Sequence, residues 1–433
     1  MDISLMVALV IVLALFFDFT NGFHDTANAM ATPIATGALT PRVAVAIAAT
    51  LNLVGAFLST EVARTISGGL IREGDAGIRI TPTMIFAGLI GAIMWNLVTW
   101  LLGLPSSSSH ALFGGLIGAV IVGTGFGAID PGVLLSKIVF PALLAPFIAA
   151  VVAYVATKLA YGLTAGSNAE ATRKQFRYGQ IFTSSLVSLA HGTNDAQKTM
   201  GVITLTLIAA GFQASGTGPE FWVVAVCALA IALGTYMGGW RIIRTVGTGI
   251  TDVTPLQGLA AEASTTATIL ASSHLGFALS TTQVASGSII GAGLGKHHGA
   301  VRWRITGRIA TAWLITLPSA GAMAAVAELV ARLGPLGIAA DALVGAVVIV
   351  LMFLRSRRNP VNHKNVTGEI DTVGTMEVGT MEVGTVEVGA LEVGAVEAGH
   401  TPTSLLKVPP VIASGRPKKP KASIGKVQQE KAP

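Results

Sequence analysis

Residues 21–30 read NGFHDTANAM, and residues 191–201 read HGTNDAQKTMG. Both polar stretches interrupt parts of the chain that are otherwise strongly apolar. Superposing Gly192 on Gly22 also pairs four further positions: His24 with Asn194, Asp25 with Asp195, Asn28 with Lys198, and Met30 with Met200. A polar motif that returns 170 residues later indicates an internal duplication of the chain.

A second pair of motifs supports the duplication. PSSSSHALFGGLIGA at 105–119 aligns with ALSTTQVASGSIIGA at 278–292, so that Ser107, Ser108 and Ser109 align with Ser280, Thr281 and Thr282. The spacing between the motifs is also kept, because 82 residues separate Asp25 from Ser107 and 85 separate Asp195 from Ser280. The chain therefore consists of two homologous halves, 1–160 and 181–335.

The composition indicates a multi-pass membrane protein. The chain has 433 residues, of which 52% are hydrophobic and 12% are charged, and its mean hydropathy is +0.69. Apolar runs of about 20 residues, the length that spans a bilayer as a helix, occur near 3–20, 43–60, 83–104, 138–160, 181–211, 221–239, 256–277, 305–331 and 336–354. We expect an all-α protein of the plasma (inner) membrane.

Other classes of protein have little support. The basic residues, which give a pI near 9.5, collect in loops and in the tail, where the positive-inside rule explains them without nucleic acid. Cys227 is the single cysteine, so an internal disulfide is excluded. ANA at 27–29 resembles a signal-peptide cleavage site, but no basic segment precedes the apolar stretch and the motif recurs later, so we expect a retained first helix.

Charge placement predicts opposite orientations for the two halves. The connector 161–180 and the RSRR sequence after the last apolar run are basic and are expected in the cytoplasm. The short apolar pieces at 110–123 and 284–295 then fit re-entrant hairpins, one in each half. We expect an inverted-topology repeat in which 21–30 interrupts its helix at membrane depth. A last membrane helix at 336–355 and a disordered, low-complexity cytoplasmic tail at 356–433 follow.

The hydroxyl clusters suit an oxyanion. Each cluster precedes a predicted helix, whose first amides and positive dipole end add to the hydrogen-bond donors. An alternative is that these hydroxyls only bond to backbone carbonyls or to a neighbouring helix. Two clusters at matching positions of two repeats favour a binding site.

The two carboxylates indicate that cations bind at the site as well. Asp25 and Asp195 lie in membrane segments, where a charge is tolerated only beside a polar cavity or a cation. Asn28, Asn194 and freed backbone carbonyls could complete oxygen-rich cation or metal sites around them. Lys198 could neutralise Asp195 or touch the anion. His24 has no histidine counterpart in the second half, and it could carry a proton.

Together these motifs resemble those of the inorganic phosphate transporter (PiT) family of secondary carriers. The resemblance rests on GFHDTANAMAT, WNLVTWLLGLPSSSSH, SLAHGTNDAQKTMG and LSTTQVASG, in this order, and covers roughly 1–355. It implies symport of inorganic phosphate across the bilayer and a homodimer. It also implies phosphate ligands at Ser107, Ser108, Ser109, Ser280, Thr281 and Thr282, with the motifs of Asp25 and Asp195 serving cation and phosphate together.

Two departures suggest the branch of the family. The sodium-coupled pattern has Asn before Asp in both motifs, whereas this chain has His24, and Lys198 is also unusual. These residues resemble the bacterial proton-coupled, low-affinity branch, which takes phosphate as a neutral complex with a divalent metal such as Mg²⁺ or Zn²⁺. Ala278 and Gln283 also differ from the first half or the family pattern. The chain needs no resident cofactor on this interpretation.

Three kinds of alternative remain open at the level of sequence: other carriers of the same fold, a membrane hydrolase and a channel. A sodium-coupled phosphate symporter and a sulfate permease would share the fold. A membrane hydrolase could use Ser109 and His110, but adjacent residues cannot easily meet as nucleophile and base, and the second half keeps hydroxyls without the histidine. We therefore expect a carrier and not an enzyme. A channel is the third alternative.

Overall fold

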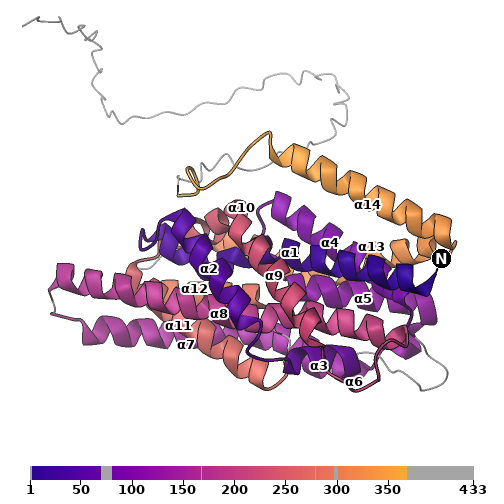
Figure 1. Cartoon of the computed structure of the whole chain (residues 1–433). Coiled ribbons are helices and arrows are strands. Elements are labelled where there is room, and N and C mark those ends of the chain that lie inside the picture. Colours follow the sequence, from indigo (N-terminus) through magenta and orange to yellow (C-terminus); the bar gives the residue numbers. More distant parts are fainter. Residues whose placement is uncertain (1, 70–79, 167, 278, 297–300, 368–433) are drawn as a thin grey trace, which may run out of the picture. The chain divides into compact units, whose positions relative to one another are not determined.

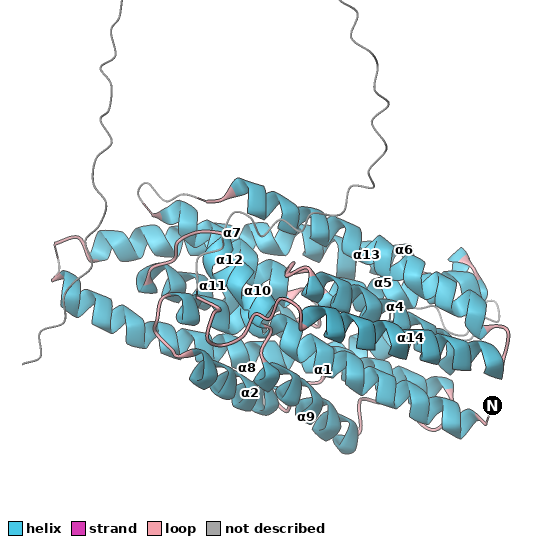
Figure 2. Ribbon diagram, turned by 90° about the horizontal axis from the view of Figure 1, so that it is seen from above, coloured by secondary structure: helices cyan, strands magenta, loops and turns pink. Residues whose placement is uncertain are grey.

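The structure is a computed structural model that describes residues 2–69, 80–166, 168–277, 279–296 and 301–367. Its described part is built from helices, without a β-strand (Figures 1 and 2). The principal helices are α1 (Ile3–Ala35), α2 (Pro41–Gly55), α3 (Glu61–Gly69), α4 (Pro82–Leu101), α5 (Ser108–Thr124), α7 (Phe140–Leu163), α8 (Ala169–Ala209), α9 (Phe221–Met237), α11 (Pro255–His274), α12 (Thr281–Gly295), α13 (Trp303–Ala331) and α14 (Pro335–Ser356). The short helices α6 (Pro131–Val133) and α10 (Trp240–Arg244), with 3₁₀ and π turns, lie between them.

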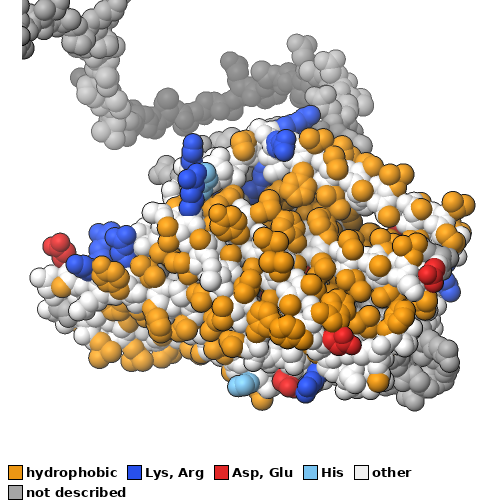
Figure 3. Space-filling view, viewed as in Figure 1, with side chains coloured by type: hydrophobic (Ala, Val, Ile, Leu, Met, Phe, Trp, Pro, Cys, Tyr) orange, Lys and Arg blue, Asp and Glu red, His pale blue; other side chains and the backbone are white. Residues whose placement is uncertain are grey.

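The apolar runs of the sequence all form helices, which confirms the all-α membrane fold. Within the described residues, five helical segments are long and apolar enough to span a bilayer, and a sixth results if α9 and the segment Trp240–Gly249, bent by 60°, count as one span. Hydrophobic side chains cover most of the face seen in Figure 3, and charged side chains lie mainly toward its margins. This distribution is typical of a surface in contact with lipid.

The two halves run in opposite directions through the molecule. The Thr36 hydroxyl at the end of α1 donates to Gln180 near the start of α8, at 2.7 Å. Near the other end of the pair, Asp18 of α1 faces Thr199 of α8. The two equivalent helices are therefore antiparallel, as an inverted repeat requires.

Helices of one half pack mainly on helices of the other. α1 packs closely on α9, and α8 packs on α2. Glycines allow this close approach at equivalent places: a Cβ at Gly22 would collide with the backbone carbonyl of Ile231, and one at Gly192 would collide with that of Asn52. Small residues let membrane helices pack at short range, so the halves form one interleaved bundle.

Each half also contributes a helical hairpin. α4 and α5 pack on each other, as do α11 and α12. Gly103 (φ +65°) and Gly276 (φ +68°) have left-handed backbone conformations that end the first helix of each hairpin. Each hairpin then packs on the helix that follows the other hairpin: α5 on α13, and α12 on α7. Both turns are thereby held near the helix pair α1 and α8.

One detail differs from the sequence-based expectations. The expected interruption at 21–30 is wrong, because α1 is helical from Ile3 to Ala35. The side chains of His24, Asp25 and Asn28 find partners on the facing helices, so the backbone need not open there. α8 begins at Ala169, so most of the connector 161–180 is helical. The expectations for Ala278 and for the tail beyond residue 367 lie outside the described residues.

Candidate functional site

The predicted site residues gather around two carboxylates in the interior. All twelve side chains are at most 6% exposed. They come from the middle of α1 and α8 and from the starts of α5 and α12: His24, Asp25, Asn28, Ser107, Ser108, Ser109, Asn194, Asp195, Lys198, Ser280, Thr281 and Thr282. The inverted repeat therefore brings four sequence-distant motifs to one place.

Asp25 receives hydrogen bonds from both hairpins. The Ser108 hydroxyl donates to Oδ2 at 2.7 Å, and the Thr282 hydroxyl donates to Oδ1 at 3.1 Å. His24 Nδ1 lies 2.7 Å from the same Oδ1. One carboxylate thus links both helix starts to α1.

Asp195 has the equivalent surroundings, with one difference. The Thr281 hydroxyl donates to Oδ2 at 2.9 Å, and Asn194 Nδ2 donates to Oδ1 at 2.8 Å. Lys198 pairs directly with Oδ1 and also donates to the Ser109 hydroxyl at 2.6 Å. The lysine therefore connects Asp195 to the hairpin of the first half. Asp25 contacts the hairpin of the second half directly, through Thr282.

Asn28 and Lys198, which the superposition pairs, both reach across to the opposite hairpin. Asn28 Nδ2 lies 3.2 Å from the hydroxyls of Thr281 and Thr282. Lys198 reaches Ser109 and, at 3.1 Å, the Leu279 carbonyl. Asn28 therefore contacts the second hairpin, and Lys198 contacts both hairpins.

The hairpin turns supply further partners. His24 Nε2 lies 3.3 Å from the hydroxyls of both Thr99 and Ser106. In the second half, Asn194 donates to the Leu279 carbonyl at 3.1 Å. The non-helical backbone at the site therefore belongs to the turns before α5 and α12, and not to the polar motif of α1.

Helices α5 and α12 begin at the site itself. Ser107 caps α5 by accepting from the His110 amide at 3.2 Å, and Ser280 caps α12 by accepting from the Gln283 amide at 3.3 Å. The first amides of a helix have no partner within it, and the positive end of the dipole adds to them. Two opposed helix starts with clustered hydroxyls are chemically suited to an oxyanion.

His191 is a site residue that the sequence reasoning missed. Its Nε2 lies 2.7 Å from Asp195 Oδ2 and 4.0 Å from Asp25 Oδ2. Atoms of Asp25, His191 and Asp195 all lie within 4.8 Å of one another, close enough to share one metal ion. The available signal was the superposition itself, which places His191 on Asn21, so that histidine and asparagine exchange places between the two motifs.

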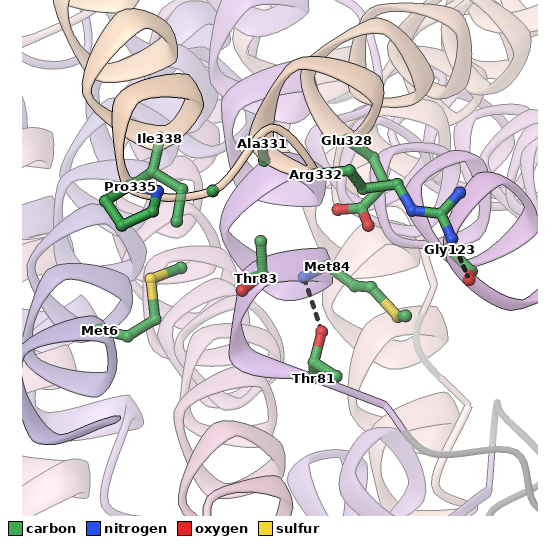
Figure 4. Close-up of a pocket in the computed structure, with 11 residues that line it drawn as sticks. Met6, Thr81, Thr83, Met84, Gly123, Glu328, Ala331, Arg332, Pro335 and Ile338 are labelled. Atoms are coloured by element: carbon green, nitrogen blue, oxygen red, sulfur yellow. Dashed lines mark hydrogen bonds between the residues drawn. The ribbon is translucent and has the colours of Figure 1, made fainter. Parts of the chain in front are cut away.

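Two of the cavities lined by described residues lie apart from the two aspartates. One of about 370 Å³ lies at the turn between α13 and α14, with Glu328 and Arg332 in its wall, and Arg332 donates to the carbonyl of Gly123 at 3.3 Å (Figure 4). The other, about 530 Å³ and mainly apolar, is lined by His110, Gln283 and residues of α7 and α13. None of the twelve site residues lines either of these two cavities.

Comparison with known proteins agrees with this geometry. The model of the phosphate transporter family matches residues 21–168 and again 160–324, once for each half. A Mycobacterium leprae protein named "Probable low-affinity inorganic phosphate transporter" is 55% identical over 84% of this chain and 88% of its own length. A Bacillus subtilis protein of the same name is 43% identical over 76% of this chain and 98% of its own.

A solved structure shares the fold. The structure titled "The sodium-dependent phosphate transporter" superposes with a TM-score of 0.67 at 23% identity, covering 76% of this chain and 99% of that one. At this identity the likeness concerns the fold alone. The double match of the family model and the closely related sequences show that this chain, a multi-pass membrane protein, belongs to the phosphate transporter family.

Proposed function

We propose that this chain is a secondary carrier that imports inorganic phosphate together with protons. The observation that carries the proposal is the meeting of two hydroxyl-capped helix starts at one pair of buried carboxylates. The names of the related proteins support phosphate as the substrate. In the proposed cycle, phosphate takes the place of the direct contacts between the hairpins and the two aspartates.

The proposed phosphate ligands are the hydroxyls of Ser107, Ser108, Ser109, Ser280, Thr281 and Thr282, with Asn28 and Lys198. The hydroxyls of Ser108 and Thr282 now donate to Asp25, and that of Thr281 donates to Asp195. The cap oxygens of Ser107 and Ser280 accept from helix amides. Phosphate offers four oxygen atoms and can accept from both hairpins at once. Binding would therefore bring the hairpins together around the substrate, as alternating access requires.

The charge of the site favours proton coupling. Asp25 and Asp195 bring two negative charges and Lys198 brings one positive charge, which leaves a net charge of −1 while His24 and His191 are neutral. Protonation of both histidines would change the net charge to +1. A site of positive charge attracts phosphate and a site of negative charge repels it, so proton binding and phosphate binding would support each other.

A divalent metal such as Mg²⁺ or Zn²⁺ could travel with the phosphate as part of the substrate. Asp25, His191 and Asp195 form a donor set that fits such an ion. Carboxylate oxygen and imidazole nitrogen suit Zn²⁺, and the carboxylates suit Mg²⁺. A metal phosphate of zero net charge would also reduce repulsion by the two aspartates.

Sodium coupling is the second candidate, because the solved structure that shares this fold is titled sodium-dependent. Transport in proteoliposomes separates the two candidates. Labelled phosphate should accumulate when a pH gradient is imposed without sodium, and labelled sulfate should not. Accumulation driven by sodium alone would contradict proton coupling, and accumulation of sulfate alone would contradict the proposed substrate.

We also propose a homodimer, which the resemblance to the family implies. Light scattering of the purified protein, corrected for detergent, should give twice the mass of one 44.2 kDa chain. A mass of one chain would contradict the dimer.

A further inference from the structure

Asp18 is a buried carboxylate that the proposed site does not use. Its side chain is 0% exposed in the middle of a membrane-spanning helix. Within the described part of the chain, neither carboxylate oxygen has a hydrogen-bond partner. The Thr199 hydroxyl of α8 is close enough to interact with this carboxylate, but the pair does not reach full hydrogen-bond geometry.

A second buried acid shows how this protein satisfies a structural carboxylate. Glu262 is 3% exposed, and it accepts from the Thr32 hydroxyl at 2.6 Å, from Gln180 at 3.1 Å and from the Thr183 hydroxyl at 2.6 Å. Among the described residues, no group makes a hydrogen bond of full geometry to Asp18. An ionised carboxylate without a partner is costly in such surroundings, so Asp18 requires a positive ligand.

Asp18 also lies on the same face of α1 as Asp25 of the central site. It precedes Asp25 by seven residues, which is about 10 Å along a helix, and Asn21 lies between them on the same face. The Asn21 side chain is 1% exposed, and among the described residues neither its oxygen nor its nitrogen has a partner. Two adjacent buried polar groups with open hydrogen-bonding positions are chemically suited to passing a proton from one to the other.

The N-terminal part of α1 is oriented toward the outer side of the membrane. The C-terminal end of α1 is bonded to Gln180, next to the basic segment that contains Arg173, Lys174 and Arg177, and such segments stay in the cytoplasm. The N-terminal part of α1, with Asp18, therefore lies between the central site and the outside.

We propose that Asp18 is the outer proton-binding residue of the transport cycle, an inference that rests on proton coupling as the proposed function. The carboxylate takes up one proton from the outer solution and becomes a neutral carboxyl group, and it returns to the ionised form when the proton moves inward past Asn21. A proton needs only the carboxylate as its ligand, whereas a metal cation needs several oxygen atoms.

The charged groups near Asp18 fit this role. Asp195 and Lys198 of α8 act on it from the direction of the central site, and the Cys227 thiol of α9 lies on another side. Helix α4, which also packs on α1, contains no titratable residue. Substrate bound between Asp25 and Asp195 would therefore change the electrostatic potential at Asp18. This effect would link proton uptake to phosphate binding.

The test compares net uptake with exchange. Asp18→Asn keeps the size and polarity of the side chain but cannot bind a proton, and Asp18→Glu keeps the acid. Ser188→Ala is the matched control, because Ser188 holds the same place in the second half, is 0% exposed, and bonds only to its own helix, to the Ser184 carbonyl at 3.0 Å. Each variant is purified, checked for folding by its thermal transition, and reconstituted with the parent protein.

We expect Asp18→Asn to exchange internal for external phosphate at the parental rate, while uptake driven by a pH gradient falls at least about tenfold, equivalent to about 1.4 kcal/mol of coupling. Asp18→Glu should retain gradient-driven uptake, and Ser188→Ala should match the parent. Unchanged gradient-driven uptake in a folded Asp18→Asn variant would overturn the role of Asp18, as would equal losses of exchange and uptake. If phosphate uptake by the parent protein does not respond to the pH gradient, the proposed proton coupling is refuted, and the role of Asp18 is refuted with it.

Discussion

Replacing Lys198 with methionine should destabilise the protein strongly. Lys198 is 1% exposed and is paired with Asp195, with further bonds to Ser109 and to the Leu279 carbonyl. Methionine fills a similar volume but leaves the Asp195 carboxylate without its ammonium partner. Breaking a buried ion pair from one side costs about 3–5 kcal/mol. We expect the lower end of this range, because His191 at 2.7 Å can still support Asp195.

A double-mutant cycle measures this effect. Thermal unfolding of the detergent-purified protein is followed for the parent, Lys198→Met, Asp195→Asn and the double variant. The single lysine variant should lose about 3 kcal/mol, and the double variant should recover about half of that loss or more, because no unpaired charge remains. An unchanged transition temperature for Lys198→Met, or a double variant with the sum of both single losses, would refute the reasoning.

Three further predictions concern packing, binding and coupling. Gly192→Val should cost about 1–3 kcal/mol of stability, because a Cβ at this position collides with the Asn52 backbone. The control Gly162→Ala, where a Cβ meets no other atom, should be neutral or slightly stabilising in the same unfolding assay. Ser108→Ala should weaken phosphate binding about tenfold in calorimetry, a loss of about 1.4 kcal/mol of binding free energy. The control Ser185→Ala should bind phosphate normally, because among the described residues the Ser185 hydroxyl donates to the Ile181 carbonyl of its own helix. His24→Asn, which copies Asn194, should keep the bond to Asp25 while uptake driven by a pH gradient falls, and undiminished uptake would show that His24 carries no proton.

The repeated motifs made much of the architecture predictable. Because NGFHDTANAM and HGTNDAQKTMG lie 82 and 85 residues before their hydroxyl clusters, the sequence was enough to expect two inverted halves with matching hairpins, and this fold is confirmed. The same alignment predicted which residues would gather, and the structure brings those twelve side chains together. Their roles in binding and coupling stay predictions.

Other features depended on contacts that the sequence does not state. The polarity of 21–30 suggested a broken helix, but α1 continues because Ser108 and Thr282 of two different hairpins satisfy Asp25. His191 was missed because only the antiparallel packing of α1 and α8 places it between both aspartates. The isolation of Asp18 likewise becomes visible only when the facing helices are in place.

A structure determined with phosphate tests the central claim most directly. The protein would be crystallised or imaged with phosphate, and with Zn²⁺ as an anomalous scatterer in a second sample. We predict density for phosphate between the starts of α5 and α12, in contact with Ser108, Ser109, Thr281 and Thr282, and a metal signal beside Asp25, His191 and Asp195. Phosphate bound elsewhere, with the hairpin hydroxyls still bonded to the two aspartates, would contradict the account.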